Sequence, residues 1–158
     1  MKIYLDTNIF YNAYCPVENN EVADWILSQL DLQNQGITSE WTILEMFRAL
    51  KKQVNLKTIA EKDAKTVIDF FLSEMGEMSD TDHLQILPIT RSMIISSRKH
   101  IFTHNLYAAD ALHTTVAISA QVDCFLTFDG DFKLDLGNIK ILNPVDPEFK
   151  AKFKRYLS

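Results

Sequence analysis

The sequence predicts an α/β fold with three layers (α/β/α), in which helices cover both faces of a central, mostly parallel sheet. Two observations support this prediction. Short apolar runs bounded by polar or turn-forming residues alternate with longer segments of helical spacing. The short runs are apolar throughout, as strands buried on both faces are. We expect one domain over residues 1–158, with right-handed crossovers between the strands.

Composition limits the class of protein. The 158 residues are 47% apolar, enough for a sizeable core. No apolar run approaches the ~18 residues of a membrane span, and the N-terminus does not look like a signal peptide, so we expect a cytoplasmic protein without membrane contact. A net charge of −5 argues against coating nucleic acid by charge alone, but not against an enzyme with a local basic patch and a bound cation. The two cysteines are far apart without CxxC context, which disfavours a disulfide framework or a zinc site.

The elements of the first half begin with an apolar strand over residues 2–6, which ends in a carboxylate. A very short strand follows Gly36 at residues 37–38, and Ser39 is a candidate cap for the next helix. Apolar residues at helical spacing predict three helices, over 21–33, 41–52 and 57–75. A polar loop over 79–82 then precedes the second half.

The second half repeats the alternation. Strands are expected at 84–89, 124–128 and 139–142, and helices at 91–102 and 107–121. Asp146, Pro147 and Glu148 resemble an N-cap, a first-turn proline and a first-turn acid, so a C-terminal helix is predicted from about 146.

Acidic side chains follow the apolar strands where a parallel sheet gathers functional groups. Asp6 ends the first strand, and Thr7 and Asn8 can hold its carboxylate by hydrogen bonds. Asp129 and Asp131 follow the strand at 124–128 around Gly130. The alternative interpretations are a helix cap for Asp6 and a simple Asp-Gly turn for Asp129.

Two further acids lie on predicted helices. Glu45 shares a helix face with Arg48 and Lys52; a solvated Glu45–Arg48 pair is the alternative. Asp110 sits among small apolar residues in the first turn of its helix, where the helix dipole alone would also favour a carboxylate. If Asp6, Glu45, Asp110 and Asp129 share one cleft, they repel one another unless a cation joins them. Mg²⁺ or Mn²⁺ is the natural partner, because both prefer oxygen ligands.

The same segments resemble a known family. LDTN (5–8), SEWTILE (39–45), AADALHTTVA (108–117) and TFDGDF (127–132) are similar to the motifs of PIN-domain ribonucleases, and most of all to VapC-like toxins of toxin–antitoxin pairs. The resemblance implies a PIN-like fold and metal ligands at Asp6, Glu45, Asp110 and Asp129. It also implies support from Asp131 and Thr127, cleavage of RNA with Mg²⁺ or Mn²⁺, a homodimer, and inhibition by an antitoxin.

Several alternatives and additions follow from individual residues. Arg48, Lys52 and His113 are candidate RNA contacts, and packing is the alternative for His113. The His100/His104 pair has zinc-like spacing without a third ligand motif, so we discount zinc.

Two rival functions compete with this interpretation. An aspartyl phosphotransfer enzyme would need an acid where Asn8 stands. The remaining rival is a catalytically silent PIN-fold module that binds a protein or RNA partner.

Overall fold

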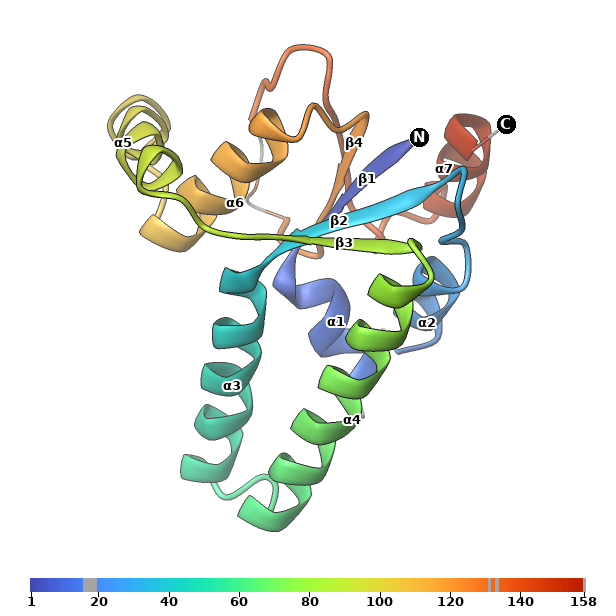
Figure 1. The fold of residues 1–158 in the computed structure, drawn as a ribbon, viewed down its shortest axis with the longest axis vertical. Coiled ribbons are helices and arrows are strands. Elements are labelled where there is room, and N and C mark those ends of the chain that lie inside the picture. The colour runs from blue at the N-terminus through green and yellow to red at the C-terminus, as the bar shows by residue number, and fades with distance from the viewer. Residues whose placement is uncertain (16–19, 131, 133, 158) are drawn as a thin grey trace.

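A five-stranded parallel sheet forms the centre of the structure (Figure 1). The computed structural model describes residues 1–15, 20–130, 132 and 134–157. Every strand pairing within these residues is parallel, and the strand order is β3-β2-β1-β4-β5. The strands are β1 (Lys2–Leu5), β2 (Gln35–Ser39), β3 (Leu84–Leu87), β4 (Cys124–Leu126) and β5 (Lys140–Leu142). The predicted parallel sheet is therefore confirmed.

Helices cover this sheet on both sides. They are α1 (Thr7–Tyr14), α2 (Asn20–Leu27), α3 (Glu40–Asn55), α4 (Glu61–Asp80), α5 (Arg91–His104), α6 (Ala108–Ser119) and α7 (Phe149–Leu157). Helices α3 and α4 run side by side away from the sheet, while α5 and α6 form a separate pair (Figure 1). No helix among the described residues is long and apolar enough to cross a membrane.

The alternation of side chains along β1 explains the three layers. Ile3 and Leu5 point into a core shared with α1, α3, α4 and α7, whereas Tyr4 points into a second core shared with α6. All three side chains are fully buried. Because successive strand residues face opposite sides, one apolar run supplies both cores at once. The predicted three-layer α/β/α architecture is confirmed.

Several boundaries differ from the sequence prediction. Helix α1, which is only eight residues long, was not predicted. Helix α2 ends at Leu27 rather than at residue 33, since the Asp31 carboxylate accepts backbone hydrogen bonds from Gln33 and Asn34 and forms a turn there. Helix α4 starts only at Glu61 and runs through Asp80, which shortens the predicted loop.

The predicted helix caps are only partly correct. Ser39 occupies the N-cap position of α3, but its side chain makes no capping hydrogen bond. The C-terminal helix begins at Phe149, later than expected. Asp146 instead accepts a hydrogen bond from the Glu148 amide at 2.9 Å, one turn before the helix.

The sheet needs a glycine at one close approach. A Cβ added to Gly36 on β2 would lie 2.9 Å from a Leu30 methyl and 3.0 Å from a Leu84 methyl, which is too close for a side chain.

The chain builds β2 and β3 on one side of β1 and β4 and β5 on the other. In a sheet of this kind, the point where the order reverses opens a crevice at the carboxyl ends of the strands. That crevice lies between β1 and β4.

Candidate active site

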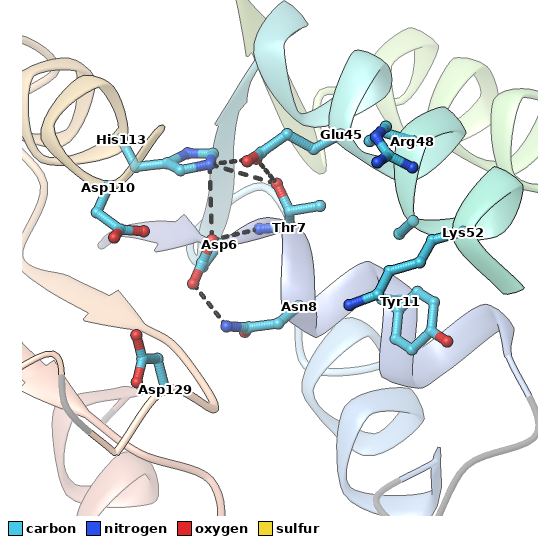
Figure 2. Close-up of a pocket in the computed structure, with 11 residues that line it drawn as sticks. Asp6, Thr7, Asn8, Tyr11, Glu45, Arg48, Lys52, Asp110, His113 and Asp129 are labelled. Carbon is cyan, nitrogen blue, oxygen red and sulfur yellow. Dashed lines mark hydrogen bonds and ion pairs between the residues drawn. The ribbon is translucent and has the colours of Figure 1, made fainter. Parts of the chain in front are cut away.

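A pocket of about 350 Å³ opens at this crevice (Figure 2). The predicted ligands Asp6, Glu45, Asp110 and Asp129 all line it, although they come from four different parts of the chain. Its remaining lining consists of Thr7, Asn8, Tyr11, Arg48, Ala49, Lys52 and His113. The fold thus brings the predicted acidic residues to one place.

Asp6 lies at the junction of β1 and α1. Its amide donates to the Leu126 carbonyl at 3.1 Å, which extends the pairing with β4 by one residue. Its side chain serves as the N-cap of α1, where Oδ1 accepts a hydrogen bond from the Thr7 amide at 2.7 Å. The same carboxylate therefore caps helix α1 and lines the pocket.

Asn8 and Thr127 fix the other oxygen of Asp6. Oδ2 accepts hydrogen bonds from the side-chain amide of Asn8 at 2.7 Å and from the Thr127 hydroxyl at 2.6 Å. Thr127 also accepts a hydrogen bond from the Asp129 amide at 3.0 Å, and the Asn8 side-chain oxygen accepts one from the Phe128 amide at 2.9 Å. These bonds tie the end of β1 to the loop after β4.

Glu45 reaches the pocket from the middle of α3. Its Oε2 accepts a hydrogen bond from the Thr7 hydroxyl at 2.5 Å and lies 2.6 Å from His113 Nε2. The start of α3 is held in turn, because the Thr38 hydroxyl donates to the Leu5 carbonyl at 3.1 Å and lies 2.8 Å from the Thr42 hydroxyl. Thr7 and His113 therefore both hold the same oxygen of Glu45.

His113 lies at the floor of the pocket, on α6. Its side chain is only 2% exposed, and its Nδ1 lies 2.8 Å from the Tyr4 hydroxyl. His113 lines the pocket although its ring is almost fully buried against Tyr4 and Glu45, and the RNA contact expected of it stays a prediction. Tyr4 was missed by sequence reasoning, although a tyrosine within a buried strand is a signal, since its hydroxyl needs a partner.

Burial and mutual repulsion shift the pKa values of two of the pocket acids, Asp6 and Asp110. Burial raises the pKa of Asp6 above its usual value, against the opposing effect of His113 and the hydrogen bonds to the carboxylate. Burial and the negative charge of Asp6 raise the pKa of Asp110, and Asp129 and Glu45 add to that effect. The pocket is thus a region of concentrated negative charge that a cation would relieve.

His113 counters part of this charge. Burial by itself lowers the pKa of His113, but the hydrogen bond to Glu45 and the charges of Asp6 and Glu45 outweigh it, so the pKa is raised. The reverse holds for Glu45: burial raises its pKa, and the hydrogen bond and charge of His113 outweigh this and lower it. His113 Nε2 also lies 3.6 Å from Asp6 Oδ1.

The basic predicted residues stand at the mouth of the pocket. Arg48 and Lys52 are exposed on α3 and line the side opposite Asp110 and Asp129 (Figure 2). The Tyr11 ring lies beside Lys52 in the same wall. One wall therefore carries positive charge and an aromatic ring, while the other carries carboxylates.

The donor set fits a hard divalent cation in its chemistry, since carboxylate oxygens are what Mg²⁺ and Mn²⁺ prefer. Among residues 1–15, 20–130, 132 and 134–157, however, no three acidic, histidine or cysteine side chains converge closely enough to hold an ion. Glu45 turns toward His113, and Asp6, Asp110 and Asp129 surround a shared space (Figure 2). The four acids therefore line one pocket without forming a ready-made ion site among the described residues. The predicted supporting residue Asp131 lies outside the described residues.

The fold is similar to those of several solved structures. VapBC2 from Rickettsia felis, bound to a DNA fragment from its promoter, matches with a TM-score of 0.64 at 20% identity, covering 90% of this chain and 98% of that chain. FitAcB from Neisseria gonorrhoeae matches with a TM-score of 0.58 at 24% identity, covering 91% and 99%. VapC20 from Mycobacterium tuberculosis, a toxin that cleaves the sarcin–ricin loop, matches with a TM-score of 0.62 at 14% identity, covering 82% and 92%.

Sequence comparison gives the family. No curated protein matches the sequence closely. The family model of the PIN domain matches residues 3–134, which is most of the chain and includes all four acidic residues of the pocket. The motifs, the sheet order and this match agree, and the chain belongs to the PIN domain family.

Proposed function

We propose that this protein is a divalent-metal-dependent endoribonuclease, with Mg²⁺ or Mn²⁺ as its cofactor, and that it is the toxin of a toxin–antitoxin pair. One observation carries the nuclease proposal: four carboxylates from separate elements line a single pocket whose opposite wall is basic. Membership of the PIN domain family supports it. The toxin role draws further support from similarity in fold to VapC20, which is a toxin that cleaves RNA at the sarcin–ricin loop.

The residues of the pocket would divide the work of hydrolysis. Asp6, Glu45, Asp110 and Asp129 would hold the cation, and Asp110 or Asp129 would orient the attacking water. A bound divalent cation makes that water more acidic and offsets charge on the phosphate. The water oxygen bonds to phosphorus and the bond from phosphorus to the 3′ oxygen breaks. The leaving oxygen takes a proton, which yields a 5′-phosphate and a 3′-hydroxyl.

Arg48 and Lys52 would hold the RNA backbone beside the carboxylates. Both are exposed, they lie one helical turn apart on α3, and both line the pocket. Their positive charges favour phosphate groups and would bring the strand across a pocket that otherwise repels it. Binding through this pair should weaken as salt concentration rises.

The test is cleavage of RNA by the purified chain with Mn²⁺ or Mg²⁺ and with EDTA. Wild type should cleave only with the cation, and Asp6→Asn and Asp110→Asn should lose activity. The matched control is Asp69→Asn, because Asp69 is an exposed acid on α4 outside the pocket. Equal cleavage in EDTA, or by all variants, would disprove the metal-dependent mechanism.

An antitoxin protein is the proposed physiological partner. The support is similarity in fold to a chain of VapBC2 and to a chain of a toxin–antitoxin complex from Klebsiella pneumoniae. A small reading frame beside the gene for this chain, encoding a DNA-binding protein, is the expected source. Co-expression of the two should yield a stable complex in which RNA cleavage is suppressed, and unhindered cleavage by the complex would contradict the proposal.

A homodimer is also proposed, with α5 as the contact surface. Ile94, Ile95, Phe102 and Tyr107 on or beside α5 are between 56% and 84% exposed, which is unusual for neighbouring large apolar side chains. Light scattering of the purified chain should give twice the monomer mass. Phe102→Glu should give the monomer mass, whereas Leu32→Glu, at an exposed apolar residue before β2, should leave the dimer intact.

A further inference from the structure

Three side chains from β1, α6 and α3 form a hydrogen-bonded chain at the floor of the pocket. Figure 2 draws two of them, His113 and Glu45. The Tyr4 hydroxyl lies 2.8 Å from His113 Nδ1, and His113 Nε2 lies 2.6 Å from Glu45 Oε2. Tyr4 is fully buried and the His113 side chain is 2% exposed. The sequence motifs single out Glu45, whereas the proposed hydrolysis gives no task to His113 or Tyr4.

The direction of the hydrogen bonds follows from simple chemistry. Burial raises the pKa of Tyr4 far above its usual value, so its hydroxyl keeps its proton. A neutral imidazole that accepts from Tyr4 at Nδ1 must carry its own proton on Nε2, facing Glu45. A protonated imidazole donates at both nitrogens, with the Tyr4 oxygen as acceptor. The pKa of Glu45 is lowered, so its ionised carboxylate can only accept, and Nε2 donates to it in both charge states.

Glu45 has particular need of such a partner. It is the longest of the four pocket carboxylates, and it extends from the middle of a helix rather than from a strand end. Asp6 is fixed by three donors, two of which, Thr7 and Asn8, directly follow it in the sequence. Glu45 is fixed instead by groups distant in sequence, His113 and the Thr7 hydroxyl, which meet at a single oxygen, Oε2.

We propose that His113, oriented by Tyr4, is a positioning residue that holds the Glu45 carboxylate at the floor of the pocket for cation binding and RNA cleavage. The inference rests on the proposed function. Metal affinity or activity typically falls about 10- to 100-fold when the partner that orients a metal-binding side chain is removed. Rings that serve packing alone would affect stability without changing cation affinity. The ring contacts of Tyr4 with Phe125, at 4.8 Å between centroids, make that alternative worth testing.

Three variants separate positioning from packing. His113→Leu removes the donor and keeps an apolar side chain at the floor. His113→Gln retains a donor, so it should partly rescue what His113→Leu loses. Tyr4→Phe keeps the ring and its stacking on Phe125 but removes the hydroxyl that orients His113. Two controls match them: Thr115→Val removes a buried hydroxyl from the same helix, and Tyr14→Phe removes a tyrosine hydroxyl outside the pocket.

The first readout needs no activity. In ¹⁵N NMR spectra of the metal-free wild type at neutral or higher pH, any neutral His113 should show its proton on Nε2, and Tyr4→Phe should shift the Nδ1 signal. The second readout is Mn²⁺ affinity, measured by electron paramagnetic resonance. Affinity should fall at least about tenfold in His113→Leu, less in His113→Gln, and stay unchanged in both controls.

The third readout is RNA cleavage, where His113→Leu should lower kcat at least about tenfold with little change in KM. Wild-type Mn²⁺ affinity and kcat in a folded His113→Leu would overturn the inference, as would a neutral His113 with its proton on Nδ1. If wild type neither binds Mn²⁺ nor cleaves RNA, the proposed function itself fails and takes this inference with it. A defect confined to the variants concerns His113 alone.

Discussion

The two acids that follow neighbouring strands, Asp6 after β1 and Asp129 after β4, are held in very different ways. The Asp6 side chain is 15% exposed and accepts three short hydrogen bonds from Thr7, Asn8 and Thr127. Asp129 is exposed, and its backbone amide donates to Thr127 in the same network. The Asp6 side of the pocket is thus largely buried, whereas the Asp129 side is exposed to solvent.

The difference indicates how the site would assemble. Asp6 keeps its position because its hydrogen bonds come from elements that the fold already joins. Asp110 and Asp129 face it across the pocket, and Asp6 and Asp129 disfavour ionisation of Asp110. A cation would draw these acids together against that repulsion. The fixed half would then set where the ion binds, and the open half would adjust to it.

The largest expected effect comes from breaking the fixed half at Asn8. Asn8→Ala removes a donor to Asp6 and leaves the Phe128 amide without the acceptor it now has. Loss of hydrogen bonds to a charged group and to a buried amide should cost about 3 kcal/mol of unfolding free energy. Urea denaturation measures it, with Asn138→Ala, in an exposed turn, as the control. A cost under about 0.5 kcal/mol would mean that Asp6 is not held as described.

Thr127→Val tests the link between the two halves. The variant keeps the shape of the side chain but removes the donor to Asp6 and the acceptor for the Asp129 amide. We expect a loss of about 2 kcal/mol in stability together with weaker Mn²⁺ binding. Thr66→Val, which removes an exposed hydroxyl bonded within α4, should change neither. Unaltered Mn²⁺ binding in Thr127→Val would show that the two halves act independently.

The pH dependence of stability should report the negative charge of the pocket. The raised pKa of His113 means that its stabilising effect is full below about pH 6.5 and is lost as pH rises through its folded-state pKa. The raised pKa values of Asp6 and Asp110 act in the same direction, because the folded state holds those protons longer. The lowered pKa of Glu45 acts in the opposite direction, but only below about pH 4.3.

The thermal midpoint in EDTA should therefore fall between about pH 6.5 and 8. Mn²⁺ should reduce the fall, since it binds the deprotonated acids and stabilises the folded state by mass action. Differential scanning calorimetry at several pH values, with and without Mn²⁺, measures both effects. A midpoint that rises with pH in EDTA would contradict the assignment of these charges.

The smallest expected effect concerns the open half. Asp110→Asn removes one of the mutually repelling charges while keeping the shape of the side chain. In EDTA it should raise the thermal midpoint by about 2–4 °C, corresponding to about 1 kcal/mol. The gain from Mn²⁺ should shrink at the same time. Asp69→Asn, outside the pocket, should leave both values unchanged, and a lower midpoint for Asp110→Asn would mean that repulsion there is negligible.

Sequence patterns predicted much of the framework for local reasons. Buried strands such as Lys2–Leu5 and Cys124–Leu126 are recognisable because parallel strands covered on both faces are apolar throughout. The acids that follow them could be selected because strand ends in such sheets meet at one edge. Helix α1 escaped prediction, since helical spacing is recognised over windows of about 11–18 residues and this helix has eight.

The sequence alone therefore determined the parallel α/β class, the strands and the acids at their ends, because apolar runs and turn signals act over a few residues. The tertiary structure decided what meets across distance. His113 pairs with Glu45, 68 residues away, and with Tyr4, 109 residues away. Periodicity places each of these side chains on a face of its own element, but only the packing of α6 and α3 around β1 brings those faces together.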